Sequence, residues 1–418
     1  MSKLVIEGPT QLQGTIKISG SKNHALPMLA AMLLTTEDVI LHNVPDIADV
    51  NVMIEILECY GVRVERTRTG LICNAENARP VSIPTNLTRK LRASLLVLGP
   101  ALARFSEAEL GFPGGDLIGA RPIDSHLNGL RSMGAKVIES EDSIKLKGRL
   151  KEATVILDEI SVTATENLIM ASVLTPGLTE IRLAATEPHI VALGEFLNSL
   201  GAKISGLGSH VLVVEGVEKL GSGEGSIIPD YLEAGTFAIA AAASKGEMLI
   251  EEFVAKDNDA LLNTFMRMSV NFQLLDDRKI LIKPAKKLRA VKIRTDIYPG
   301  FPSDLQAPMA VLCTQASGVS EIFETMYEGR LQYLFELQRM GAHVNVRDSH
   351  VGLIEGPVNL HGTDLISFDV RAGATVLIAA VIAHGKTTID RIEHIDRGYE
   401  HLDGRLRSLG AKISRIGS

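Results

Sequence analysis

A short motif recurs six times along the chain and constrains the fold more than any other feature. It consists of an apolar residue, a glycine or serine, and then a strand-like segment, as in MGAKV and LGAKI. Successive copies lie 73, 67, 68, 72 and 69 residues apart. This period is longer than that of standard short solenoid repeats, so it predicts six copies of a larger unit. The small residues of the motif are Gly61, Gly134, Gly201, Ser269, Gly341 and Gly410.

Each repeat is predicted to contain helices and short strands. A glycine at the motif fits the end of an amphipathic helix, because glycine adopts the left-handed conformation without a steric penalty. The alternating apolar residues in GAKVIESEDSIKLKG and GAHVNVRDSHVGLIEG predict a strand, a turn and a second strand. A further strand is predicted in segments such as TTIDRIEHI and GEMLIEEFV.

A second, Ala-rich helix in each repeat is apolar on nearly every side, so we expect it to be buried. The expected fold is therefore α/β, with buried helices inside and sheets outside, and three repeats in each of two similar domains. The six Ala-rich segments are HALPMLAAMLL, RASLLVLGPALA, TENLIMASVL, EAGTFAIAAAAS, LQAPMAVLCTQAS and GATVLIAAVIAHG.

Composition narrows the possible functions. The net charge is −7 and the chain has no long basic run, which argues against nucleic acid as a partner. The start MSKLVIEGPT lacks the apolar stretch of a signal peptide, and segments such as TVLIAAVIA are too short to cross a bilayer. We therefore expect a cytoplasmic protein without membrane insertion. Cys59, Cys73 and Cys313 lack metal-ligand spacing and are expected to be reduced and buried, and no metal or organic cofactor is indicated.

Charged residues gather where the Ala-rich helices are predicted to begin. Lys22, Arg92 and Arg371 stand at three such starts, and Asp304 and Asp369 at two. A helix N-terminus attracts anions, and a nearby cation strengthens the attraction. Each residue alone is equally well read as a solvated charge or, for Asp304, as a helix cap. Because equivalent positions of a repeat converge in space, their recurrence favours one site for an anionic substrate. Arg121, Arg330 and Arg397 are further candidates.

Four further residues have simpler interpretations when each is taken by itself. Ser21 is predicted to be the N-cap of the first Ala-rich helix rather than a catalytic hydroxyl. His24 and His126 are expected to be structural residues with satisfied hydrogen bonds. The stretch PGGDLIGARP, residues 113–122, places Asp116 among glycines, which by itself is typical of a surface turn.

Six segments together resemble the enolpyruvyl transferases, from about residue 4 to the end: KISGSKNHALPMLAAMLL, LRASLLVLGPALARF, PGGDLIGARPID, FPSDLQA, VRAGATVLIAA and HIDRGYEHLDGRLRSLGA. Lys22 followed by Asn23 favours the branch that acts on nucleotide sugars over the branch that acts on 3-phosphoshikimate. The resemblance implies two inside-out, barrel-like α/β domains with three repeats each. One spans residues 22–229 and carries the Asp116 loop, the other spans residues 1–21 and 230–418, and the active site lies in the cleft between them.

The resemblance implies transfer of enolpyruvate from phosphoenolpyruvate to the 3′-hydroxyl of UDP-N-acetylglucosamine, with release of phosphate. This is the first committed step of peptidoglycan synthesis, and we expect a monomer. Asp304 is the implied general base and Asn23 the sugar ligand. The implied phosphate ligands are Lys22, Arg121 and Arg397; Arg92 and Arg371 extend the cationic field, and Arg330 and Asp369 shape the closed site.

By the same resemblance, Asp116 is the general acid that protonates the methylene carbon of the donor. Most members of the family have cysteine at this position, on a mobile loop for which Gly114, Gly115 and Gly119 supply hinge freedom. Fosfomycin inactivates the family by alkylating that cysteine. A carboxylate is a far weaker nucleophile than a thiolate, so the sequence predicts fosfomycin resistance.

Two segments are implied to line the nucleotide-sugar pocket, and they contain departures from the family pattern. Ser125, Glu159, Thr163, Gly329 and Leu331 all replace residues that are more usual in the family. The acceptor is thus less firmly implied than the donor. Transfer to another nucleotide and a non-catalytic homologue that binds UDP-sugars remain alternatives, whereas a purely structural repeat protein does not explain the cations. The implied lining residues are Arg121, Pro122, Ile123, Asp124, Ser125, Ile160, Ser161, Val162, Thr163 and Met326.

Overall fold

The computed structural model describes residues 2–116 and 118–417 and forms two compact units. Unit 1 comprises Met1–Ser19, Asp116–Ala120 and Pro229–Ser418, and unit 2 comprises Gly20–Gly115 and Arg121–Ile228. Within the described residues, no helix combines the length and the apolar character needed to span a membrane.

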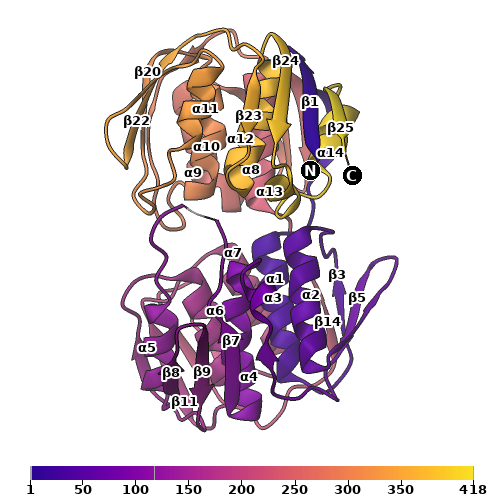
Figure 1. Ribbon diagram of the computed structural model, residues 1–418, viewed down its shortest axis with the longest axis vertical. Coiled ribbons are helices and arrows are strands. Elements are labelled where there is room, and N and C mark those ends of the chain that lie inside the picture. Colours follow the sequence, from indigo (N-terminus) through magenta and orange to yellow (C-terminus); the bar gives the residue numbers. More distant parts are fainter. Residues whose placement is uncertain (1, 117, 418) are drawn as a thin grey trace. The chain divides into compact units, whose positions relative to one another are not determined.

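Each unit contains three small sheets that share one pairing pattern (Figure 1). In every sheet an edge strand pairs in parallel with the second strand, which pairs antiparallel with the third, and the third pairs antiparallel with the fourth. In unit 2 the orders are β14 (Gly223–Ser226), β3 (Val39–His42), β5 (Gly70–Asn74), β4 (Arg63–Arg66); β6 (Ser82–Ile83), β7 (Glu107–Gly111), β9 (Ser143–Lys147), β8 (Lys136–Glu139); and β10 (Thr154–Ile156), β11 (Leu178–Arg182), β13 (Val211–Glu215), β12 (Lys203–Ser205).

The sheets of unit 1 repeat this order with strands from both ends of the chain. β1 lies between β24 and β25, with Leu4 opposite Ile389, so the N-terminal strand completes the last repeat. The first strand thus pairs with two strands from the C-terminal part of the chain. The orders are β2 (Gln13–Lys17), β15 (Glu247–Glu251), β17 (Lys279–Lys283), β16 (Asn271–Asp276); β18 (Leu288–Arg289) and β19 (Lys292–Arg294), β20 (Ala316–Phe323), β22 (Val351–Gly356), β21 (His343–Val346); and β23 (Asp364–Ile366), β24 (Gly385–Asp390), β1 (Lys3–Gly8), β25 (Lys412–Ile416).

The Ala-rich helices are buried, as their composition predicts. Every residue of α8 (Tyr231–Ala243) is buried, and α10 (Ser303–Cys313) packs against both α8 and α12 (Val370–Ile382), with the strands of unit 1 outside them (Figure 1). The corresponding helices of unit 2 are α1 (Lys22–Ala31), α4 (Leu98–Phe105) and α6 (Val162–Val173). The helices that precede the hairpins are α2 (Ala48–Tyr60), α5 (Asp124–Ser132), α7 (Pro188–Ser199), α9 (Asp259–Met268), α11 (Tyr333–Arg339) and α14 (Leu402–Ser408).

The small residues of the repeated motif adopt the predicted left-handed backbone. Ser269, the one residue with a side chain, has φ of 62°, and the five glycines have φ between 91° and 106°. The inside-out α/β fold of six repeats is therefore confirmed by the sheets, the buried helices and these six turns.

Two local expectations are wrong. Residues 92–103 do not form one α-helix, because Arg92–Val97 is a 3₁₀ segment, η2, that leads into α4. Pro100 is the third residue of α4, in the first turn, where its missing N–H leaves no helical hydrogen bond unmade. Cys59 is exposed on α2, whereas Cys73 and Cys313 are buried as expected; all three are free thiols.

Candidate active site

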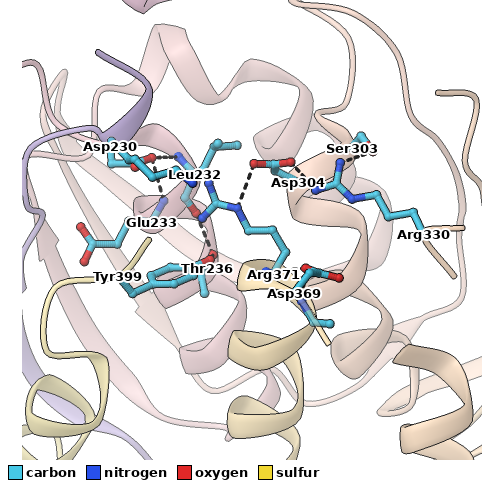
Figure 2. A network of polar contacts seen from close by, with 12 residues as sticks. Asp230, Leu232, Glu233, Thr236, Ser303, Asp304, Arg330, Asp369, Arg371 and Tyr399 are labelled. Carbon is cyan, nitrogen blue, oxygen red and sulfur yellow. Dashed lines mark hydrogen bonds and ion pairs between the residues drawn. The ribbon is translucent and has the colours of Figure 1, made fainter. Parts of the chain in front are cut away.

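Asp304 is at the centre of a charged group in unit 1, which we call the Asp304 cluster: Asp304, Arg330 and Arg371 (Figure 2). Its Oδ1 accepts from Arg330, and its Oδ2 lies 2.8 Å from Nε of Arg371. The N-cap position of α10 is held by Pro302, and Asp304 follows in the first turn. The alternative that Asp304 is a helix cap is therefore wrong. Its carboxylate is 27% exposed, so it remains accessible from outside the helix core.

Arg330 is fixed by contacts on both sides. Its Nη1 donates to Oγ of Ser303 at 2.8 Å, and Ser303 donates to Oε2 of Glu324 at 2.6 Å. Burial lowers the pKa of Arg330, but Asp304 and Asp369 more than offset this, and the pKa lies above its ordinary value. Arg330 is thus a permanently charged group in a defined orientation.

Arg371 is held in the first turn of α12. Asp369 is the N-cap of this helix, and its side chain accepts from the backbone N–H groups of Arg371 at 2.7 Å and Ala372 at 2.9 Å. The guanidinium lies 5.1 Å from the ring centre of Tyr399. Its Nη1 is buried and has no hydrogen-bond partner within residues 2–116 and 118–417. Asp369 therefore caps α12, and this cap fixes the start of the helix that carries Arg371.

Asp116 forms an ion pair in unit 1, so it is more than a turn residue. Its Oδ1 lies 2.5 Å from Nη1 of Arg397, and the two side chains are 17% and 18% exposed. The segment that carries it is tied down by two backbone contacts. Ala120 N–H donates to Oε1 of Glu328 at 2.7 Å, and Gly329 N–H donates to the carbonyl of Ile118 at 3.0 Å.

Glycine at 119 and 329 makes this approach possible. Gly119 has φ of 137°, and a Cβ there would lie 2.5 Å from the carboxylate of Glu328. A Cβ on Gly329 would lie 2.9 Å from the backbone of Ile118. The hydrogen bond from Ala120 lowers the pKa of Glu328, which favours the charged acceptor that holds the segment. The departure at Gly329 is thus explained by close backbone packing.

In unit 2, Lys22 is the first residue of α1 and its Nζ lies 3.2 Å from Oδ2 of Asp49 in the first turn of α2. Asn23 follows it and is half-buried. Ser21 occupies the predicted N-cap position, but its side chain makes no capping hydrogen bond. His24 is only partly satisfied, since Nδ1 accepts from Ile228 N–H at 3.1 Å and Nε2 has no partner among the described residues.

Arg92 joins the start of η2 to the segment before α5. Its Nη2 donates to the carbonyl of Arg121 and, at 3.2 Å, to that of Pro122. Ile123 is the N-cap of α5, Asp124 begins the helix, and Ser125 is buried. Arg92 therefore contacts the beginning of the first predicted lining segment, residues 121–125, through two carbonyl groups.

The second lining segment meets the first through a histidine. Ser161 is the N-cap of α6 and its Oγ accepts from Ala164 N–H at 3.4 Å. Ile160 and Val162 flank it, and both are half-buried. The hydroxyl of Thr163 lies 3.0 Å from Nε2 of His126 on α5. The starts of α5 and α6 are therefore joined by a direct side-chain contact.

Known proteins are similar to this chain in both sequence and fold. The family model for EPSP synthase (3-phosphoshikimate 1-carboxyvinyltransferase) matches residues 6–406. Proteins named UDP-N-acetylglucosamine 1-carboxyvinyltransferase from Photorhabdus laumondii and Yersinia pestis are each 41% identical over 100% of this chain and 99% of their own. The chain belongs to the enolpyruvyl transferase family. The crystal structure of the enolpyruvyl transferase NikO from Streptomyces tendae has a TM-score of 0.90 at 25% identity, covering 100% of this chain and 99% of its own. EPSP synthase from Acinetobacter baumannii, at 16% identity over 100% of both chains, has a TM-score of 0.77 and shares the fold.

Some of the predicted site residues contact one another within a unit. Unit 1 holds Asp116 with Arg397 and the Asp304 cluster, and Met326, which is 40% exposed, lies in the turn after β20. Unit 2 holds Lys22 and the two lining segments. Reasoning from sequence missed the residues that support them, and no motif marks these residues. They are Asp49, Asn167, Ser303, Glu324 and Glu328.

Proposed function

We propose that this chain transfers enolpyruvate from phosphoenolpyruvate to the 3′-hydroxyl of UDP-N-acetylglucosamine, releasing phosphate, as the first committed step of peptidoglycan synthesis. The observation that carries the proposal is 41% identity along the whole chain with proteins named for this activity. The presence of two separate carboxylates, Asp116 and Asp304, each beside arginine, supports it, because the reaction needs one group to give a proton and another to take one.

In the first step, carbon C2 of the donor forms a bond to the acceptor oxygen. The methylene carbon C3 gains a proton from Asp116, and the 3′-hydroxyl gives its proton to Asp304. Arg330 and Arg371 hold Asp304 as a carboxylate, which is the form that accepts a proton. Asn23 orients the sugar. The product of this step is a tetrahedral adduct that carries the phosphate.

In the second step, the bond from C2 to the phosphate oxygen breaks and C3 returns a proton to Asp116, which restores the double bond, while Asp304 gives the proton from the hydroxyl to the leaving phosphate. Lys22, Arg121 and Arg397 bind the phosphate through both steps, and Arg92 and Arg371 add positive charge around the anionic substrates. Before the reaction begins, Arg397 is paired with Asp116 at 2.5 Å. Donor phosphate competes for Arg397, which releases Asp116 to take up the proton that it later delivers.

The remaining assignments belong to the same proposal. Active-site residues come from both proposed domains, of which one spans residues 22–229 and the other residues 1–21 and 230–418. The nucleotide sugar is bound by residues 121–125, residues 160–163 and Met326. Asp369 orients Arg371 by capping α12. We place the protein in the cytoplasm, where phosphoenolpyruvate and nucleotide sugars are made, and propose that it acts as a monomer.

The deciding experiment measures phosphate release from phosphoenolpyruvate with UDP-N-acetylglucosamine and, in parallel, with UMP. Release that depends on UDP-N-acetylglucosamine and is abolished by Lys22→Ala supports the proposal. Faster release with UMP would assign the chain to transfer onto another nucleotide. Binding of UDP-N-acetylglucosamine without phosphate release would assign it to the non-catalytic class.

A further inference from the structure

A continuous set of hydrogen bonds, which we call the His126 chain, crosses the core of unit 2. It consists of Asn167, His126 and Thr163. Asn167 on α6 has no exposed surface, and His126 is 3% exposed. Nδ2 of Asn167 lies 2.9 Å from Nδ1 of His126, and Nε2 of His126 lies 3.0 Å from Oγ1 of Thr163. The chain ends at the first turn of α6, where Thr163 is half-buried.

The direction of each hydrogen bond follows from the fixed end of the chain. Gly99 N–H can only donate, and it donates to Oδ1 of Asn167 at 2.8 Å. The amide nitrogen of Asn167, Nδ2, donates to the carbonyl of Leu95 at 2.7 Å. The same nitrogen carries a second hydrogen, so it is also the donor in its contact with His126. Nδ1 of His126 must then accept, which leaves the single proton of the neutral ring on Nε2.

The consequence reaches the hydroxyl of Thr163. Nε2–H of His126 donates to Oγ1, so this oxygen is occupied as an acceptor and its own O–H points to another group. Burial, and next the charge of Arg92, lower the pKa of His126 to about 3, so the ring stays neutral at physiological pH. The Thr163 hydroxyl is thus a donor of fixed position at the start of α6.

We propose that Thr163 is a specificity-determining residue for the UDP part of the acceptor, and that His126 and Asn167 are positioning residues that aim its hydroxyl at an oxygen of the diphosphate. The inference rests on the proposed function, which assigns residues 160–163 to the nucleotide sugar. An anionic oxygen is the best partner for such a donor. Where a glycine stands at this position, as is frequent in the family, this donor does not exist.

The first test compares Thr163→Val with Thr163→Ser. The valine variant keeps the shape and loses the hydroxyl, so KM for UDP-N-acetylglucosamine rises about tenfold while kcat and KM for phosphoenolpyruvate change less than twofold. Serine restores the wild-type KM. Thr179→Val is the matched control, since Thr179 is a buried threonine of unit 2 whose hydroxyl has no hydrogen-bond partner in the described part of the chain. An unchanged KM in Thr163→Val would overturn the inference.

The second test addresses the positioning residues. His126→Leu raises the same KM by several fold, and His126→Gln, whose amide nitrogen can still donate to Thr163, restores most of it. Titration calorimetry with UDP alone gives a readout independent of catalysis, in which Thr163→Val weakens binding about tenfold. Wild-type protein that binds UDP but releases no phosphate would contradict the proposed reaction and leave this inference standing. Equal affinity of wild type and Thr163→Val for UDP would refute the inference itself.

Discussion

The polar centres of the two units differ in how they hold functional side chains at helix starts. In unit 1, Asp304 lies between two arginines, and the cluster carries full charges that are largely buried. In unit 2, the His126 chain contains no charge and fixes Thr163 through a neutral ring. A buried charge needs a partner of opposite sign, whereas a neutral chain needs only that each donor meets an acceptor.

This difference matches the tasks that we assign to the two centres. A group that takes up a proton must change its charge during the reaction, and the arginines around Asp304 stabilise the form that starts the step. A group that recognises a substrate has to keep its position and its hydrogen-bond direction, which a neutral chain does without the cost of removing a charge from water. Variants that change the charged groups of unit 1 or the neutral His126 chain of unit 2 therefore test this difference.

The largest effect is expected for Asp304→Asn. The amide has nearly the same shape but cannot take the hydroxyl proton, so kcat falls about 10³-fold. Steady-state phosphate release measures the loss. The control is Asp296→Asn, because Asp296 is an exposed aspartate of the same unit whose nearest cation, Arg294, is 4.0 Å away. Near-normal kcat in Asp304→Asn would show that the cluster is only structural.

Asp116→Asn is expected to lower kcat about 100-fold, because an amide cannot deliver a proton to carbon. Asp116→Cys keeps activity and moves the pH optimum toward alkaline values, since an ordinary thiol has a pKa near 8.5 and an ordinary aspartate near 3.9. The pH–rate profiles of wild type and the cysteine variant decide this. Superimposable profiles would count against the role of Asp116 as acid.

The same pair of proteins tests drug response. Wild-type protein is expected to retain activity in fosfomycin, because a carboxylate is a poor nucleophile, and Asp116→Cys is expected to be inactivated. Mass spectrometry detects the adduct on the cysteine variant. An adduct on Asp116 of the wild type would refute the prediction.

Most of the fold is predictable from the sequence because the repeated motif reports backbone geometry directly. The glycines that mark helix ends give the number of repeats. The apolar composition of the Ala-rich helices indicates that these helices are buried. The α-helix predicted over residues 92–103 is the exception. There the α-helix begins only at Leu98, with Pro100 in its first turn, and RASLLV before it is a 3₁₀ segment despite its favourable composition.

The site is predictable only where a residue is itself part of a recognisable pattern. Lys22 and Asp304 stand at helix starts that the pattern locates. The residues that support them are not predictable in this way. Asp49 contacts Lys22, and Glu324 accepts from Ser303 beside Asp304, through tertiary packing that no local spacing encodes. The prediction that His126 is a structural residue with satisfied hydrogen bonds is correct, since both ring nitrogens have partners, but it missed that His126 connects α5 to Thr163.

A smaller effect is expected for Gly329→Ala, which tests how the Asp116 segment is held. The added Cβ would lie 2.9 Å from the backbone of Ile118, so the hydrogen bond from Gly329 to that residue must lengthen. We expect kcat/KM to fall about tenfold, comparable to the loss of one hydrogen bond in a precisely placed segment. Gly404→Ala is the control, since its Cβ would meet only ordinary contacts, 3.5 Å or more away. Equal kcat/KM for both variants would show that this docking does not limit catalysis.

The smallest effect concerns the neutrality of the His126 chain. Folding depresses the pKa of His126 to about 3, so the unfolded chain binds its proton near pH 6.5 while the folded chain does not. Stability from this group is therefore present above pH 6.5 and is lost as the pH falls toward 3. Between pH 6.5 and 5.5 the loss is about 1 kcal/mol, and His126→Gln, which cannot titrate, removes it. Hydrogen exchange of α5 and α6 in both proteins at the two pH values measures the difference, with the exposed His343→Gln as control. If His126→Gln and wild type lose the same protection on acidification, the ring is charged in the folded protein, and the neutral chain that distinguishes unit 2 from the Asp304 cluster does not exist.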